Sequence, residues 1–262
     1  MYGFKVDFDE EERIALREAL TDMKDLVKAE LFVSDECEWC EATISMLRTI
    51  SEESPSRDGR NLFKVEIYRK GVNDDIIKKL RINRYPTIHL LEGSIRYYGI
   101  PAGEEIRAFV ETIIRISQGD SGLEGSTIEK IKNFNSSAVI ETIVTPSCPY
   151  CPYAVLLANM VAFESYKAGK KNITSIVVEA YENMDIAEKY AVSSVPTIAI
   201  NERVEFIGVP YEDQLLDSIY RIAQKKPAAK PSLAGRSVED KELKRLIQEV
   251  IKEIEEKEES KQ

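Results

Sequence analysis

The chain has 262 residues, 43% of them hydrophobic, which is enough to bury the cores of two domains of ordinary size. Its 46 acidic and 36 basic residues leave a net charge of -10, which argues against nucleic-acid binding because that needs clustered Lys and Arg. No apolar run is long enough to span a bilayer, and the acidic N-terminus does not resemble a leader segment, so we expect a cytoplasmic protein with no membrane partner.

In the first half, the hydrophobic pattern predicts alternating helices and strands. Asp9 and Glu12 form a capping box that opens the first helix. A buried strand then turns through Cys37 into a second helix, and the polar segment 51–61 is typical of a loop. The predicted elements are helix 9–23, strand 28–34, a helix after Cys37 through residue 50, strand 62–68, helix 74–80, hairpin strands 87–91 and 95–98, and helix 103–117.

The second half predicts the same order of elements again. They are helix 127–134, strand 138–144, helix 154–166, strand 173–178, helix 186–190, hairpin 197–207 and helix 212–224. A Gly-rich segment at 119–122 marks the junction. We therefore expect domains at 1–119 and 120–224, an extended linker at 225–237 and a charged amphipathic helical tail at 238–262. The apolar stripe of that tail either docks onto its own chain or forms a homo-oligomer or partner contact.

The four cysteines fall into two Cys-x-x-Cys pairs, Cys37 with Cys40 and Cys148 with Cys151. About 50 residues after each pair comes an X-Pro-Thr-Ile segment, and a Gly-(Ile/Val)-Pro segment follows in both halves. Three landmarks in one order indicate an internal duplication with two thiol sites.

The spacing of each pair favours redox chemistry. A thiolate attacks disulfides, and a helix N-terminus favours the thiolate, so we expect Cys37 and Cys148 to lie there and to attack first. Cys40 and Cys151, one helical turn on, would resolve the mixed disulfide. Trp39 and Tyr150 lie between the cysteines, where an apolar rim would contact unfolded substrates.

Other interpretations of the two pairs are weaker. A disulfide framework would tie distant segments together, whereas cysteines so close in sequence close almost no loop. A structural zinc site typically has ~15 to 20 residues between its pairs, far fewer than here. A non-catalytic binding protein would not require both cysteines of each pair. We therefore expect no metal and no cofactor beyond the redox-active disulfides.

The Cys-Pro-Tyr-Cys segment resembles the glutaredoxin active site, and the tandem pattern, with the segments 96–103 and 145–152, resembles the glutaredoxin-like protein disulfide oxidoreductases of archaea and thermophilic bacteria. The resemblance covers roughly residues 8–223. It implies two tandem thioredoxin-like domains, each a three-layer α/β/α unit with a central mixed sheet. It also implies an enzyme that reduces, forms or isomerises protein disulfides, regenerated by a thioredoxin-reductase-type flavoprotein. An electron carrier that serves a peroxiredoxin is the alternative.

The resemblance also implies that the bonds Tyr85-Pro86 and Val195-Pro196 are cis. Tyr85 and Val195 would then lend backbone groups to an extended substrate.

The sequence departs from the family pattern in two places: the charged C-terminal helix is not expected in most members, and the position of a buried acid differs. Leu31 and Thr142 stand where thioredoxin carries a buried acid, which leaves Glu30 and Glu141, one residue earlier, as weak candidates for proton transfer. His89, on a hairpin strand, is expected to be a packed or surface residue rather than a base.

Overall fold

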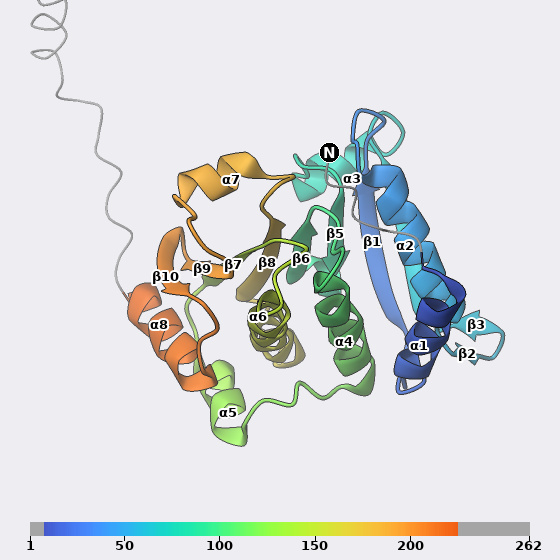
Figure 1. The fold of residues 1–262 in the computed structure, drawn as a ribbon. Coiled ribbons are helices and arrows are strands. Elements are labelled where there is room, and N and C mark those ends of the chain that lie inside the picture. The colour runs from blue at the N-terminus through green and yellow to red at the C-terminus, as the bar shows by residue number, and fades with distance from the viewer. Residues whose placement is uncertain (1–7, 225–262) are drawn as a thin grey trace, which may run out of the picture. The chain divides into compact units, whose positions relative to one another are not determined.

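The computed structural model describes residues 8–224 (Figure 1). The linker and the charged helix expected at 225–262 lie outside the described residues. The first repeat contains α1 (Glu10–Leu20), β1 (Val27–Val33), α2 (Cys40–Glu53), β2 (Ser56–Arg57), β3 (Arg60–Asn61), β4 (Phe63–Arg69), α3 (Asp74–Leu80), β5 (Thr87–Leu90), the 3-10 turn η1 (Leu91–Gly93), β6 (Ile95–Tyr98) and α4 (Glu105–Gln118).

The second repeat follows the same order. It contains α5 (Gly125–Asn133), β7 (Ala138–Val144), α6 (Cys151–Lys167), β8 (Ile173–Glu179), α7 (Met184–Lys189), β9 (Thr197–Ile200), β10 (Arg203–Ile207) and α8 (Glu212–Gln224). The predicted capping box is present, because Asp9 and Glu12 each accept a hydrogen bond from the other's backbone amide. The segment expected to be a loop at 51–61 instead ends α2 and forms the small hairpin β2–β3.

Apart from the β2–β3 hairpin, the strands form one mixed sheet in the order β10-β9-β7-β8-β6-β5-β1-β4. Within the first repeat, β1 is parallel to β4 and antiparallel to β5; β7 has the same relation to β8 and β9. The repeats join where β6 runs parallel to β8, from Ile95 opposite Ser175 to Tyr98 opposite Val178. Each half therefore has the thioredoxin-like strand order, and hydrogen bonds make the two half-sheets continuous.

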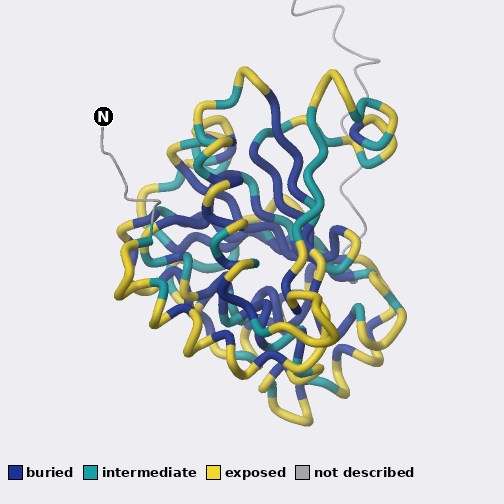
Figure 2. The backbone as a smooth tube through the Cα atoms, turned by 90° about the vertical axis from the view of Figure 1, so that its right-hand side faces the viewer, coloured by how far each residue is buried: buried dark blue, intermediate teal, exposed yellow. Residues whose placement is uncertain are grey.

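The side chains of each strand alternate between the two faces of the sheet. On β7, Ile140 packs in a cluster with α5, α6 and α8, whereas Ile143 packs with Ile186 of α7 on the other face. The sheet is therefore covered on both sides, as expected for a three-layer arrangement, and Figure 2 shows the buried strands in the interior.

A buried polar network ties the repeats together. Asn159 of α6 donates hydrogen bonds to the hydroxyl oxygens of Tyr97 on β6 and Thr112 on α4, at 2.8 and 3.1 Å, and accepts one from the Ser175 hydroxyl on β8 at 2.7 Å. Asn159 is fully buried. This network satisfies polar groups from both repeats at the point where α4 packs against α6.

None of the helices in the described residues has the length and apolar character needed to cross a membrane.

Candidate active site: two cysteine pairs

The first cysteine pair lies between the end of β1 and the start of α2. The Cys37 amide donates to the Ser34 carbonyl at 3.2 Å, which turns the chain out of the strand. Cys37 and Cys40 form a disulfide with a Cα–Cα distance of 5.5 Å. Cys37 is half-buried and Cys40 is 1% exposed, so Cys37 is the sulfur more accessible to a partner.

The second pair has the same local geometry. The Cys148 amide donates to the Thr145 carbonyl at 3.1 Å, and Cys148 and Cys151 form a disulfide with a Cα–Cα distance of 5.5 Å. The Cys151 amide donates a hydrogen bond to Cys148 Sγ at 3.1 Å. This contact places the Cys148 sulfur where an unpaired helix amide favours a negative charge.

The helix after Cys37 is confirmed as α2, whereas α6 begins three residues before the expected range 154–166. Both helices begin at the second cysteine of the pair, and the first cysteine lies in the loop just before the helix. The N-cap positions are Trp39 and Tyr150, and neither makes a side-chain cap.

The two X-Pro segments pack on the hydrophobic cluster that includes three of the cysteines. Both bonds, Tyr85-Pro86 and Val195-Pro196, are cis. Tyr85 and Val195 are half-buried against the same hydrophobic cluster that contains Cys40, Cys148 and Cys151. The fold therefore brings the predicted cysteines and the residues before the prolines to one cluster, although their sequence positions lie far apart.

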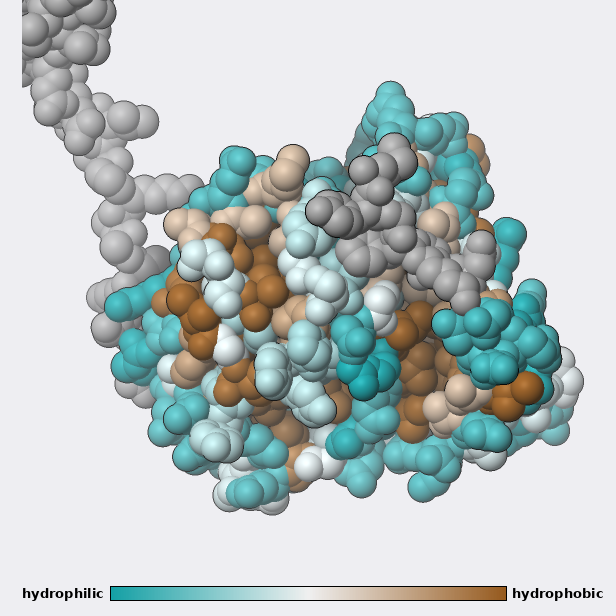
Figure 3. All heavy atoms as spheres, viewed as in Figure 1, coloured by the Kyte–Doolittle hydropathy of each residue, from teal (hydrophilic) through white to brown (hydrophobic). Residues whose placement is uncertain are grey.

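The aromatic residues between the cysteines differ in exposure. Trp39 is half-buried and packs on the cluster, whereas Tyr150 is 67% exposed. Between the loop before Cys148 and α7, a groove of about 660 Å³ is lined by Thr145, Tyr181, Met184, Val192 and Val195. Figure 3 shows hydrophobic surface over this part of the molecule, and a second apolar hollow between α1 and α4.

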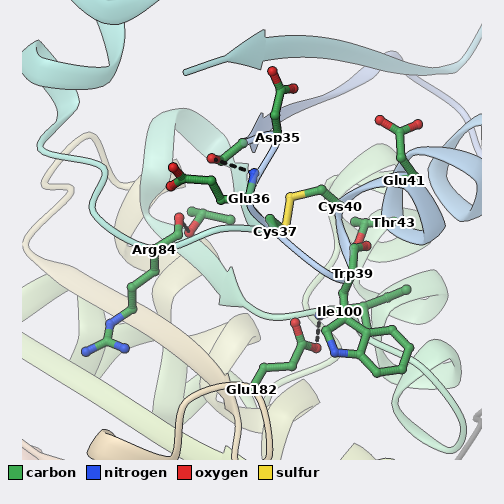
Figure 4. Close-up of a disulfide and its surroundings, with 12 residues drawn as sticks. Asp35, Glu36, Cys37, Trp39, Cys40, Glu41, Thr43, Arg84, Ile100 and Glu182 are labelled. Atoms are coloured by element: carbon green, nitrogen blue, oxygen red, sulfur yellow. Dashed lines mark hydrogen bonds between the residues drawn. A yellow bond between two sulfur atoms is a disulfide. The ribbon is translucent and has the colours of Figure 1, made fainter. Parts of the chain in front are cut away.

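The acidic residues around the first pair are largely matched by cations. Arg69, the last residue of β4, forms ion pairs with Asp35 and Glu41 at 2.6 and 3.2 Å. Lys70 pairs with Glu36 at 3.3 Å. In Figure 4, Asp35 and Glu41 point away from the disulfide, whereas Glu182 and Trp39 lie on its other side.

Each site also contacts the opposite repeat. The Pro146 carbonyl, in the loop before Cys148, accepts a hydrogen bond from the Glu104 amide at 2.8 Å. Gly103 allows this approach, because a Cβ there would lie 2.4 Å from the same oxygen. The first site is in turn approached by Glu182, from the segment between β8 and α7.

The weak candidates for a buried acid are wrongly placed for proton transfer. Leu31 packs in the cluster that contains Cys40, and its neighbour Glu30 therefore points to the opposite face of the sheet. Glu141 likewise points away from the cluster of Ile140, and accepts a hydrogen bond from the Tyr190 hydroxyl.

Two other carboxyl groups are buried instead. Burial raises the pKa of Glu182 to about 8 and that of Glu105, in the first turn of α4, to about 8. Both oxygens of Glu105 lack a hydrogen-bond partner in the described residues. Neither residue carries a sequence signal, because an acidic residue in a loop or a first helical turn is normally exposed.

His89 is packed, which is one of the two environments expected for it. It is 3% exposed and lies edge-on against Phe32 at 5.0 Å between ring centroids. Burial lowers its pKa to about 4, so it is neutral at physiological pH.

The cysteines form two separate disulfides. Within residues 8–224, no group of three or more His, Cys, Asp or Glu side chains is arranged to hold a metal ion.

Comparisons with known proteins agree with this architecture. Residues 139–219 match the family model "Thioredoxin domain". The thioredoxin of Methanocaldococcus jannaschii is 37% identical over 84 residues, covering 32% of this chain and 94% of that protein. An alkyl hydroperoxide reductase of Pseudomonas aeruginosa is 27% identical over 136 residues, covering 52% of this chain and 25% of that protein.

A solved structure extends the similarity to both repeats. The protein disulfide oxidoreductase of Aeropyrum pernix K1 superimposes with a TM-score of 0.82 and 48% identity, covering 84% of this chain and 95% of that one. The chain shares 48% identity with nearly the whole of that protein, and it has tandem thioredoxin folds with two Cys-x-x-Cys disulfides. The chain therefore belongs to the protein disulfide oxidoreductases of the thioredoxin family.

Proposed function

We propose that this chain is a thiol–disulfide oxidoreductase that reduces, forms or isomerises disulfides of other proteins through its two sites. The observation that carries the proposal is the geometry of each pair. A disulfide closes at the start of a helix, the residue before a cis-proline packs on the same hydrophobic cluster, and one sulfur of each pair lies outside the helix.

In the reductive direction, the thiolate of Cys37 or Cys148 attacks a substrate disulfide. One substrate sulfur leaves as a thiolate and a mixed disulfide forms. The thiolate of Cys40 or Cys151 then attacks the first cysteine, which releases the second substrate thiolate. The substrate gains two electrons and the enzyme ends as a disulfide. Oxidation is the reverse sequence. In isomerisation, the substrate thiolate released in the first step attacks another disulfide of the substrate, and a substrate thiolate then attacks the mixed disulfide and releases the enzyme cysteine as a thiolate.

The surface beside the second site supports protein substrates. Tyr181 and Met184, which line the groove beside Thr145 and Val195, are 61% and 65% exposed. Exposed apolar side chains at the mouth of a reactive site suit unfolded segments. Trp39, Tyr150, Tyr85 and Val195 are the residues that we propose contact the substrate, with Pro86 and Pro196 shaping the two loops.

We further propose that a thioredoxin-reductase-type flavoprotein reduces the enzyme, and that it works in the cytoplasm of a thermophilic organism with no cofactor besides its disulfides. The similarity to an archaeal thioredoxin and to the Aeropyrum pernix protein supports this setting. Homo-oligomerisation through the C-terminal segment is a proposal that concerns residues outside the described part.

An activity assay tests the function. With dithiothreitol, the purified chain should accelerate the reduction of insulin, and in a glutathione buffer it should refold scrambled ribonuclease. A Cys37→Ser/Cys148→Ser variant is the matched control, since it lacks both attacking sulfurs. Failure of the wild-type chain in both assays would remove the proposal.

A carrier role is the second candidate, supported by the similarity to the Pseudomonas aeruginosa alkyl hydroperoxide reductase over half of this chain. A carrier should pass electrons to a peroxiredoxin and leave insulin and ribonuclease unchanged. Activity toward all three substrates would favour the broader oxidoreductase.

A further inference from the structure

The first redox site is not built by the first repeat alone. Glu182 comes from the second repeat, yet its side chain extends into the surroundings of the Cys37–Cys40 disulfide, on the side opposite Asp35 and Glu41 (Figure 4). Its Oε1 accepts a hydrogen bond from the Ile100 amide at 2.8 Å. Gly99 makes room for this contact, because a Cβ there would lie 2.8 Å from Glu182 Oε1. The backbone at 99–100 therefore holds the carboxyl group in place.

The second carboxyl oxygen of Glu182 stabilises no part of the fold by a hydrogen bond to the described residues. Oε2 is buried and has no hydrogen-bond partner among the described residues. A buried carboxyl oxygen without a partner is costly, so its retention calls for an explanation. The Cys37–Cys40 disulfide, in whose surroundings Glu182 lies, gives one, because opening and closing that bond moves protons.

The charged groups around Glu182 favour its protonated form. The Glu179 carboxylate accepts a hydrogen bond from the Glu182 amide at 2.6 Å, and Glu38 approaches from the cysteine loop. The nearby cation, Arg84, is bonded to Asp185 and Asn183. Burial, opposed by the Ile100 hydrogen bond and reinforced by Glu179 and Glu38, raises the pKa of Glu182 to about 8. Both its forms are therefore accessible near neutral pH.

We propose that Glu182 completes the first redox site from the second repeat by exchanging a proton with the Cys37–Cys40 pair. The inference rests on the proposed function and adds one step to it. In the mixed disulfide, the Cys40 thiol gives its proton to the Glu182 carboxylate. The Cys40 thiolate attacks the Cys37 sulfur, the Cys37–Cys40 bond forms, and the bond to the substrate sulfur breaks. The departing substrate thiolate then takes the proton from Glu182.

The position of the first repeat that is equivalent to Glu182 carries no carboxyl group. When β4 and β8 are aligned, Val72 stands where Glu182 stands, and Val72 is 76% exposed. The two sites of one chain therefore offer an internal comparison, in which a change at Glu182 should act on the first site and leave the second unchanged.

The test uses two single-site proteins. Cys148→Ser/Cys151→Ser leaves only the first site, and Cys37→Ser/Cys40→Ser leaves only the second. Each is prepared with Glu182 and with Glu182→Gln, which keeps an oxygen for the Ile100 amide. The rate of mixed-disulfide resolution is measured by stopped flow from pH 5 to pH 10, with a peptide disulfide as substrate. Equal thermal denaturation midpoints show that the variants are folded.

In the first-site protein, Glu182→Gln should remove an inflection near pH 8 and slow resolution at pH 7 by about 10-fold or more. In the second-site protein, the substitution should change neither. Glu179→Gln should keep the inflection but move it to lower pH, because a neighbouring negative charge is removed.

An unchanged pH profile in the first-site protein would overturn the inference, as would an equal loss in both proteins. Loss of the inflection in Glu179→Gln but not in Glu182→Gln would assign the proton to Glu179 instead. If neither single-site protein reduces any disulfide, the proposed function fails, which is a different result from an active first site that ignores residue 182.

Discussion

Cys40 and Cys151 are 1% and 0% exposed, and their partners, the half-buried Cys37 and the 7% exposed Cys148, lie outside the helices. Replacing Cys40 or Cys151 by Ser should leave the first cysteine able to attack but remove the sulfur that releases the substrate. Covalent adducts with a denatured substrate that still contains its disulfides should accumulate on non-reducing gels. Cys37→Ser and Cys148→Ser are the controls. Accumulation in these variants, and not in the other two, would reverse the assignment.

A second prediction at this scale concerns the difference between the two attacking thiols. Cys148 Sγ receives an amide hydrogen bond, and no carboxylate lies within four residues of it in sequence. Around Cys37, Arg69 and Lys70 offset three of the four nearby acids, so the difference should be modest. We expect Cys148 to react with iodoacetamide at lower pH than Cys37 in single-site proteins. The opposite order would show that tertiary contacts outweigh the local charges.

Glu105 leads to a prediction about stability and pH. Its folded pKa, about 8, lies above the ordinary 4.5. The folded state therefore holds a proton that the unfolded state releases. The free energy of unfolding falls as the pH rises from about 4.5, and the fall ends above pH 8, where the carboxyl group is ionised in both states. The penalty at pH 7 is about 3 kcal/mol. Glu105→Gln should flatten this fall in urea denaturation, whereas Glu104→Gln, which only removes a neighbouring charge that helps to raise the Glu105 pKa, should reduce it slightly. Parallel pH profiles for wild type and Glu105→Gln would contradict the prediction.

At the scale of elements, most of the fold could be predicted because its signals are local. The ranges of α3, β7 and α8 agree with the expected ones, since apolar spacing and flanking turn residues set them. The hairpin β2–β3 could not be predicted, because strands of two exposed residues carry no alternation. The two redox cysteine pairs could be predicted from their spacing alone. The burial of Glu182 and Glu105 could not be predicted, because it results from contacts between the repeats, and no local sequence pattern encodes such contacts.

The packing of α6 against α4, β6 and β8 gives an element-scale prediction. Asn159→Ala leaves Tyr97 Oη, Thr112 Oγ1 and Ser175 Oγ without their shared partner in a buried site. We expect the free energy of unfolding to fall by about 3 kcal/mol. Thr112→Val, which removes one bond of the network, should cost less. A loss below about 1 kcal/mol for Asn159→Ala would mean that water replaces the amide.

For the whole molecule, the pairing of β6 with β8 predicts that the repeats do not behave as independent domains. A fragment of residues 8–119 would expose the β6 edge, and one of residues 120–224 the β8 edge. We expect each fragment to self-associate, and the mixture to recover one-to-one complexes in analytical ultracentrifugation. Two monomeric fragments with native circular dichroism would instead support separable domains with a boundary near residue 119.

The join between β6 and β8 is head to tail, because β8 corresponds to β4 and β6 corresponds to β10. The sheet therefore ends in β4 and β10, the same two kinds of edge that meet at its centre. Edges related in this way allow identical chains to add one after another into an open filament. Here β10 has a register irregularity between Val204 and Phe206, whereas β4 carries the charges of Lys64 and Glu66. Bulges and charges of this kind oppose strand addition, so we expect both outer edges of the sheet to resist pairing with another copy, although the strand order would accept one.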